Sequence, residues 1–215
     1  MFNYDNAFWR FMGRVGDFTL LSILFLLCSI PLVTFGAALC AVYSVIFSIL
    51  ESRDQGMLRG YLKGLRQSFK HGIILSVLFI IIFGVIYIDI RLFPLMGLPQ
   101  IVFYSLLGFT LFTFILALSI FIYVFPLEAR YTNTLAALIK NAILLSIKNL
   151  PKTILMAVLD IVIIGSGLLS LVYVPQFFIF PLLLAVPAMA WVNSALLKKE
   201  LKLEINIQES GNECI

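Results

Sequence analysis

The amino-acid sequence predicts an all-α, polytopic integral membrane protein with about six transmembrane helices, arranged as three helical hairpins. Two observations carry this prediction. Of the 215 residues, 62% are hydrophobic and only 12% are charged, whereas a soluble domain is usually about half apolar and a quarter charged. In addition, the charged residues lie in short intervals between long apolar runs. Such a chain has too few polar side chains to cover a surface in water, so its expected solvent is lipid.

The distribution of the basic residues predicts the orientation of the chain. Lysine and arginine flank membrane helices on the cytoplasmic side. Of the 15 basic residues, 14 fall in the intervals before, between and after the predicted hairpins, which leaves only Arg91 outside. Both termini are therefore expected in the cytoplasm. The net charge of +4 could also indicate a nucleic-acid-binding protein. However, the lysine and arginine residues do not form one dense patch, so no nucleic acid partner is expected.

Residues 1–17 are predicted to form an interfacial helix and residues 18–50 the first hairpin. Both flanks of residues 18–50 are basic, so this run must enter the membrane and return. Its turn is predicted between Pro31 and Gly36, because proline removes a helix hydrogen bond and glycine tolerates a turn. Each arm then has about 13 residues and reaches about 20 Å, less than the hydrocarbon thickness of about 30 Å. Two short crossings are preferred, and a re-entrant hairpin stays open.

Residues 72–126 and 153–197 are predicted to form the second and third hairpins. The outer turn of the second hairpin holds Asp89 and Arg91, and the third hairpin turns at Pro175. The whole chain, residues 1–215, is expected to be one membrane domain. Its remaining cytoplasmic parts are an amphipathic helix in residues 51–71, a second helix in residues 127–152 and a tail in residues 198–215.

The segment of residues 51–71 has the strongest local pattern. Its basic and apolar residues recur at helical spacing on opposite faces of one helix. A basic amphipathic helix lies along a membrane surface or docks to a partner protein, and the pattern alone favours the membrane surface. The predicted basic face, a candidate contact for lipid or partner, consists of Arg59, Lys63, Arg66 and Lys70, and the apolar face of Leu58, Tyr61, Leu62, Leu65 and Phe69.

The second cytoplasmic segment resembles the first. Residues 61–70 can be laid against residues 139–148 without a gap, and both stretches end in Ser-x-Lys. The match is short. It suggests that the second and third hairpins descend from a shared unit, in which an inner helix precedes a helical hairpin.

Asp160 is the one acidic residue placed deep within a predicted span. It lies eight residues past Lys152, about 12 Å deeper in a helix. A charge at that depth costs at least about 2.5–3.5 kcal/mol, so the side chain should face protein or a cavity. One interpretation is a proton- or cation-linked site. The preferred one is a structural carboxyl, hydrogen-bonded to neighbouring groups such as Thr110, Thr113 or Asn193.

Other patterns indicate packing rather than chemistry. Gly36, Cys40 and Ser44 recur every four residues, which permits close helix packing. His71 is the single histidine and the three cysteines have no pairing pattern, so no metal site is expected. The sequence contains no GxGxxG, GxxxxGK[ST], HExxH or GxSxG motif. We therefore expect neither an enzyme nor a cofactor.

Two stretches resemble the YesL family of bacterial membrane proteins. Residues 30–43, which read Ile-Pro-Leu-Val-Thr-Phe-Gly-Ala-Ala-Leu-Cys-Ala-Val-Tyr, are similar to one family signature. Phe-Pro-Leu-Glu-Ala-Arg at residues 125–130, followed by residues 138–143 and 148–152, resembles a second conserved block. One departure is the Leu-Ser-Ile-Leu-Phe of residues 21–25, where the family usually has an asparagine and a tryptophan.

The resemblance implies a domain of unknown function, common in Firmicutes and often encoded beside carbohydrate uptake transporters. It supplies no catalytic residues. The expected function is a non-enzymatic accessory or interaction subunit in the bacterial cytoplasmic membrane. Its expected partners are the lipid bilayer and the permease or ATPase subunits of a sugar ABC transporter. The alternative is a small transporter, or a membrane-embedded substrate-binding subunit, that uses the core around Asp160.

Overall fold

The computed structural model describes residues 7–51, 56–96, 99–131, 134–173 and 184–197, and these residues are almost entirely helical, without a β-strand. The predicted all-α fold is confirmed for this part of the chain. The elements are α1 (Ala7–Ser29), η1 (Leu32–Thr34), α2 (Phe35–Leu50), α3 (Met57–Gln67), α4 (Phe69–Leu92), η2 (Phe93–Met96), α5 (Gln100–Arg130), α6 (Leu135–Lys148) and α7 (Leu150–Tyr173), followed by a helix at Leu184–Leu197.

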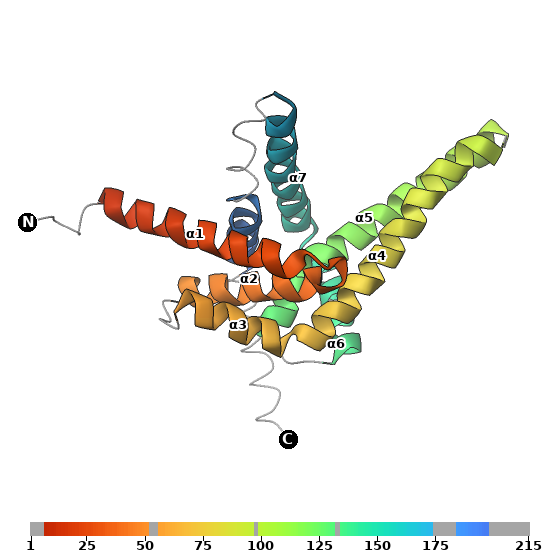
Figure 1. Cartoon of the computed structure of the whole chain (residues 1–215). Coiled ribbons are helices and arrows are strands. Elements are labelled where there is room, and N and C mark those ends of the chain that lie inside the picture. Colours follow the sequence, from red (N-terminus) through yellow and green to blue (C-terminus); the bar gives the residue numbers. More distant parts are fainter. Residues whose placement is uncertain (1–6, 52–55, 97–98, 132–133, 174–183, 198–215) are drawn as a thin grey trace, which may run out of the picture.

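Helix α2 is the centre of the fold. It contacts α1, α3, α4 and α5, and Figure 1 shows it enclosed by these helices. Of its most apolar stretch 61% is buried within the protein, against 22% for α4 and 17% for α5. A helix that is apolar all round belongs in such a position. Helices α4 and α5 instead leave most of their apolar surface to the surroundings.

Small residues let α2 and α4 approach closely, as the four-residue spacing predicts. A methyl group added to Gly72 would lie 2.5 Å from the Cα of Ala37, a distance that real Cβ atoms do not show. The backbone N–H of Gly36 donates a 2.7 Å hydrogen bond to Ser76 Oγ across the same contact. Glycine at these two positions is therefore required by packing, because any side chain would separate the helices.

Three of the described helical segments are long and apolar enough to cross a membrane. They are Leu32–Leu50, Phe69–Met96 and Gln100–Arg130. The apolar helices Val15–Ser29 and Leu184–Leu197 are shorter. These segments indicate a membrane protein, and the total of six crossings in three hairpins stays a prediction.

Helices α4 and α5 run antiparallel, side by side, and project from the rest of the molecule as an arm (Figure 1). Phenylalanine rings join the two helices near the base of the arm. The Phe79 and Phe121 rings meet edge to face with centroids 5.1 Å apart, and the Phe83 ring lies 6.1 Å from Phe121. Such geometry adds about 0.5–1.5 kcal/mol per pair to the burial of the rings.

The chain reverses between α1 and α2, around the predicted proline. Pro31 precedes η1, and Thr34 Oγ1 donates hydrogen bonds to the carbonyls of Cys28 (2.6 Å) and Pro31 (2.8 Å). Gly36 follows, inside the first turn of α2, where it serves the contact with α4. Helix α1 is continuous across residue 17, where an interfacial helix was expected to end, since no proline interrupts it. Pro175 and residues 198–215 lie outside the described residues.

Candidate functional site

Helix α3 is fixed to the core by glycines and one tyrosine. A Cβ on Gly64 would lie 2.9 Å from Ser44 Cβ and 3.3 Å from Ala41 Cα, both on α2. Tyr61 is fully buried, and its hydroxyl donates a 3.3 Å hydrogen bond to the carbonyl of Leu24 on α1. Gly60, directly before Tyr61 in the helix, is buried as well. One face of α3 therefore lies directly against α1 and α2.

The apolar residues of α3 do not form one buried face, which corrects the predicted pattern. Tyr61 is buried, whereas Leu58 and Leu62 are 52% and 53% exposed. At 3.6 residues per turn, these two leucines lie beside the glycine face and not on it. Hydrophobic periodicity predicted that the leucines are buried, because it counts apolar side chains and glycine has none. Contact with α2 selects glycine, since only glycine allows the two backbones to come so close.

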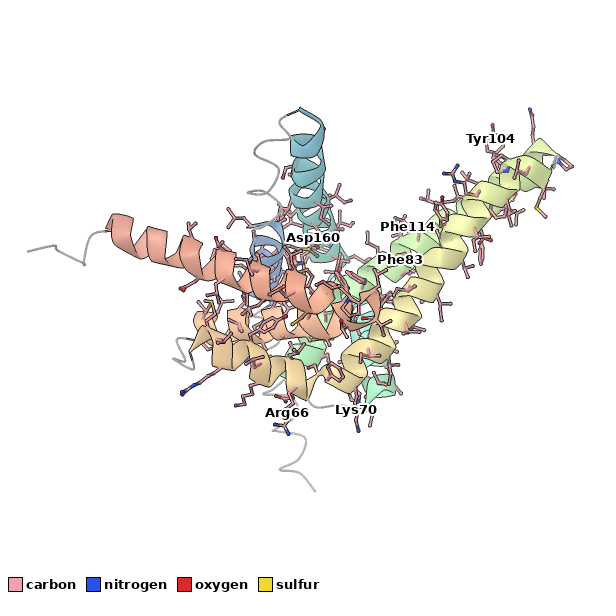
Figure 2. The ribbon with its side chains drawn as sticks, in the orientation of Figure 1. Arg66, Lys70, Phe83, Tyr104, Phe114 and Asp160 are labelled. Atoms are coloured by element: carbon pink, nitrogen blue, oxygen red, sulfur yellow. The ribbon has the colours of Figure 1, made fainter. Side chains whose placement is uncertain are left out.

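The basic side chains of α3 form a third strip, which we call the basic row: Arg59, Lys63 and Arg66. All three are exposed, and within the described residues none of them forms an ion pair with an acidic group. Lys70 is also exposed. Figure 2 shows the side chains of Arg66 and Lys70 directed away from the helices, at the end of the molecule opposite the tip of the arm. The basic row is thus available for contact with anionic groups.

Lys70 does not belong to the same helix as the basic row. Helix α3 ends at Gln67, Ser68 forms the break, and α4 starts at Phe69. The predicted single helix through Lys70 is therefore wrong. The buried Ser68 accepts a 2.7 Å hydrogen bond from the N–H of Gly72. The break lets α3 follow α2 while α4 turns away to place Gly72 on α2.

Asp160 on α7 is buried and hydrogen-bonded. Asn193 Nδ2 lies 3.2 Å and 3.1 Å from its two carboxylate oxygens and 3.4 Å from the hydroxyl of Tyr43. The predicted partnership with Asn193 is confirmed. The other two candidate partners, Thr110 and Thr113, instead donate to carbonyls of their own helix, each at 3.0 Å. Asp160 lies near the middle of α7, and Figure 2 shows it beside the central helices.

The surroundings of Asp160 join three helices through polar atoms. Asp160 is 5% exposed and Asn193 is 0% exposed. Tyr43 contributes from α2, so the group spans α2, α7 and the helix Leu184–Leu197. Asn193 Oδ1 and Ser194 Oγ are buried without a hydrogen-bond partner among the described residues. Buried polar atoms normally have a hydrogen-bond partner, so a further polar group could bind at these two atoms.

A second polar cluster lies where α2, α4 and α5 come together. His71 Nδ1 is 3.1 Å from Glu128 Oε1, and the Glu128 side chain is only 5% exposed. Arg130 Nη1 is 2.7 Å from Glu51 Oε1, and its guanidinium carbon is 5.4 Å from the centre of the Phe47 ring. The two pairs connect the ends of three helices that are distant in sequence.

Sequence reasoning missed this second cluster. Two signals pointed to it: Glu128 and Arg130 lie in the Phe-Pro-Leu-Glu-Ala-Arg stretch, and His71 is the single histidine, directly before a span. Within the described residues, no three His, Cys, Asp or Glu side chains gather in a metal-binding arrangement. The cluster fits a structural link between helix ends, because Glu128 Oε1 contacts the His71 ring and Arg130 is paired with Glu51.

One protein-family model matches about a third of the chain. The model of the family described as protein of unknown function, DUF624, matches residues 18–90. The match covers α2, α3, about half of α1 and most of α4, and it leaves Glu128, Asp160 and Asn193 outside. The description is compatible with the resemblance to the YesL family and assigns no activity. No curated protein and no solved structure matches the chain.

Proposed function

We propose that this protein is a non-enzymatic interaction subunit of a bacterial cytoplasmic membrane, and that α3 docks a partner protein. One observation carries the proposal: α3 is held by Gly60, Tyr61 and Gly64. Its leucines and the basic row consequently remain on the outside. A helix that only rests on lipid needs its own apolar face for attachment, whereas the attachment of α3 comes from the protein.

The exposed surface of α3 has the features of a recognition helix. Leu58 and Leu62 form an apolar strip, and the basic row runs along one side of it. Apolar anchors on a helix supply contact area, and neighbouring charges select a partner of opposite charge. The partner is therefore expected to present an acidic surface with an apolar groove.

Membrane location and orientation are supported by the helices and the charges. Segments Phe69–Met96 and Gln100–Arg130 are long enough to span a bilayer. With 14 of 15 basic residues in the predicted cytoplasmic intervals, α3 lies on the cytoplasmic side together with both termini. The resemblance to the YesL family supports a role in carbohydrate uptake, with the permease or ATPase subunits of a sugar ABC transporter as partners.

Site-specific photo-crosslinking in intact bacterial membranes tests this proposal. A photoreactive amino acid replaces Leu62 on α3, and the same amino acid at Lys140 on α6 is the matched control. The expected result is a defined crosslink to one transporter subunit from position 62 and none from position 140. Crosslinks to lipid alone from position 62 would assign α3 to the membrane surface and contradict the proposal.

A second candidate function is a small transporter or substrate-binding subunit that uses the core around Asp160. The observation that favours it is the buried Oδ1 of Asn193, which has no hydrogen-bond partner among the described residues. It lies beside a carboxylate that could carry a proton or a cation. Asp160→Asn keeps the shape and a hydrogen-bonding amide. If Asp160 is structural, the variant should fold and support growth on sugars like the wild type. Normal folding with loss of uptake of a radiolabelled sugar would favour the transporter instead.

A further inference from the structure

The arm formed by α4 and α5 contains an open apolar groove. The rings of Phe83 and Phe114, with centroids 6.0 Å apart, close its end nearest the core, and Figure 2 shows both between the two helices, midway along the arm. From there towards the tip, the groove encloses about 580 Å³. It reaches from Phe83 on α4 to Phe93, the first residue of η2. This distance of ten residues corresponds to about 15 Å of helix.

The walls of the groove accept only apolar groups. They include Ile86, Tyr87, Leu107 and Leu111. Thr110 is the single lining residue with an aliphatic hydroxyl, and its Oγ1 is already bonded to the carbonyl of Leu106 at 3.0 Å. A length of about 15 Å is half of the hydrocarbon thickness of a bilayer, which is the depth of one leaflet. The groove therefore has the polarity and the length for an acyl chain.

Arg91 lies beside the groove, in contact with the wall residue Tyr87. Its Nε donates a 3.3 Å hydrogen bond to the hydroxyl of Tyr87, and its guanidinium carbon is 5.4 Å from the centre of the Tyr87 ring. A residue of the groove wall thus holds the arginine in place. The nearest acid in the sequence, Asp89, is two residues away on the same helix and on another face. The structure gives Arg91 no carboxylate partner within the described residues.

We propose that this groove binds one phospholipid, with an acyl chain between α4 and α5 and its phosphate on Arg91. The planar guanidinium offers paired N–H donors that match phosphate oxygens. Arg91 is also the one basic residue on the predicted outer side, so the lipid belongs to the leaflet at the tip of the arm. This site is independent of the docking role of α3.

Native mass spectrometry of the delipidated full-length protein tests the site. The probes are phosphatidylglycerol, diacylglycerol with the same chains, and inorganic phosphate. The wild type should hold one phosphatidylglycerol, bind diacylglycerol about fivefold more weakly because the phosphate contact is missing, and hold no inorganic phosphate. Arg91→Gln should reduce phosphatidylglycerol binding to the level of diacylglycerol, while Lys140→Gln, at an exposed position of α6, should change nothing.

A second pair of variants tests the groove itself. Leu111 and Ile115 are both exposed on α5, at 55% and 53%, but only Leu111 lines the groove. Leu111→Trp should fill the groove and abolish binding of both lipids, whereas Ile115→Trp should preserve it. Equal phosphatidylglycerol binding by the wild type, Arg91→Gln and Leu111→Trp would overturn the proposal. Binding of inorganic phosphate that depends on Arg91, without bound lipid, would also overturn it by identifying a site for free phosphate.

Discussion

Helices α3 and α6 share a register but contact the core in different ways. When residues 61–70 are aligned with residues 139–148, Gly64 corresponds to Ala142 and Ser68 to Ser146, and all four residues are buried. Helix α3 packs on α2 and α6 packs on α5, in each case the preceding long helix. The residues that the sequence alignment pairs thus lie on the buried side in both segments.

The difference lies in the residues that make these contacts. Helix α3 uses glycine, while α6 uses side chains such as Leu138 and Leu145, which are 1% and 2% exposed. On the outer surface of α3, the leucines and the basic residues lie on separate strips. On α6, by contrast, Leu144 is 60% exposed and lies between Lys140 and Lys148 in the sequence. Glycine contacts leave the larger side chains of α3 for the surface. Of these two helices, only α3 therefore carries its exposed leucines and its basic residues on separate strips.

The largest effect is expected at the glycine contact of α3. Gly64→Val places branched carbon atoms where even a Cβ would be 2.9 Å from Ser44 Cβ. Overpacking of this kind should lower the free energy of unfolding by about 3 kcal/mol. Thermal unfolding in detergent, followed by circular dichroism, measures the loss. Gly84→Ala is the matched control because a methyl group there meets nothing within 4 Å, and equal losses in both variants would contradict the close contact.

An intermediate effect is expected at the position that follows the aligned segments, where the two segments have different residues. His71 aligns with Asn149, so His71→Asn gives the α3 unit the residue of the α6 unit. The shorter amide cannot reach Glu128 Oε1 as the imidazole does at 3.1 Å, so a buried carboxylate loses its partner. We expect the free energy of unfolding to fall by about 2 kcal/mol. Denaturant titration measures it, and restored stability in His71→Asn/Glu128→Gln would attribute the loss to the unpaired charge.

The smallest effect is expected at the aligned position of α6. Ala142→Gly removes one buried methyl group from a contact that other side chains maintain. The cost should be about 1 kcal/mol, mainly from the lower helix propensity of glycine. In the same thermal unfolding assay, Ala142→Gly should be clearly more stable than Gly64→Val. A larger loss in Ala142→Gly than in Gly64→Val would reverse the comparison between the two helices.

Local features of the fold could be predicted from the sequence. Composition identified a membrane protein, the proline at residue 31 marked the reversal, and the spacing of Gly36, Cys40 and Ser44 indicated close packing. The depth of Asp160 required a polar partner, and Asn193 was among the side chains available for it. These predictions succeeded because each depends on one segment, or on a requirement that any fold must meet.

Features that depend on distant contacts could not be predicted. The orientation of α3 is set by the approach of its glycines to α2, and hydrophobic periodicity takes no account of glycine. The break at Ser68 follows from the different directions of α3 and α4 in the assembled fold. His71 and Glu128 are 57 residues apart in the sequence, and no local pattern connects them.

The central claim is that the basic row of α3 recognises a protein. Its most direct test uses the transporter subunit identified by crosslinking, with the protein in nanodiscs of neutral phosphatidylcholine, where anionic headgroups make no contribution. Substituting Arg59, Lys63 and Arg66 with Gln keeps the glycine face and the helix propensity, and Lys140→Gln/Lys148→Gln on α6 is the control. Binding of the subunit should be lost in the triple variant and kept in the control. Equal binding of the subunit by the wild type and the triple variant would contradict the account.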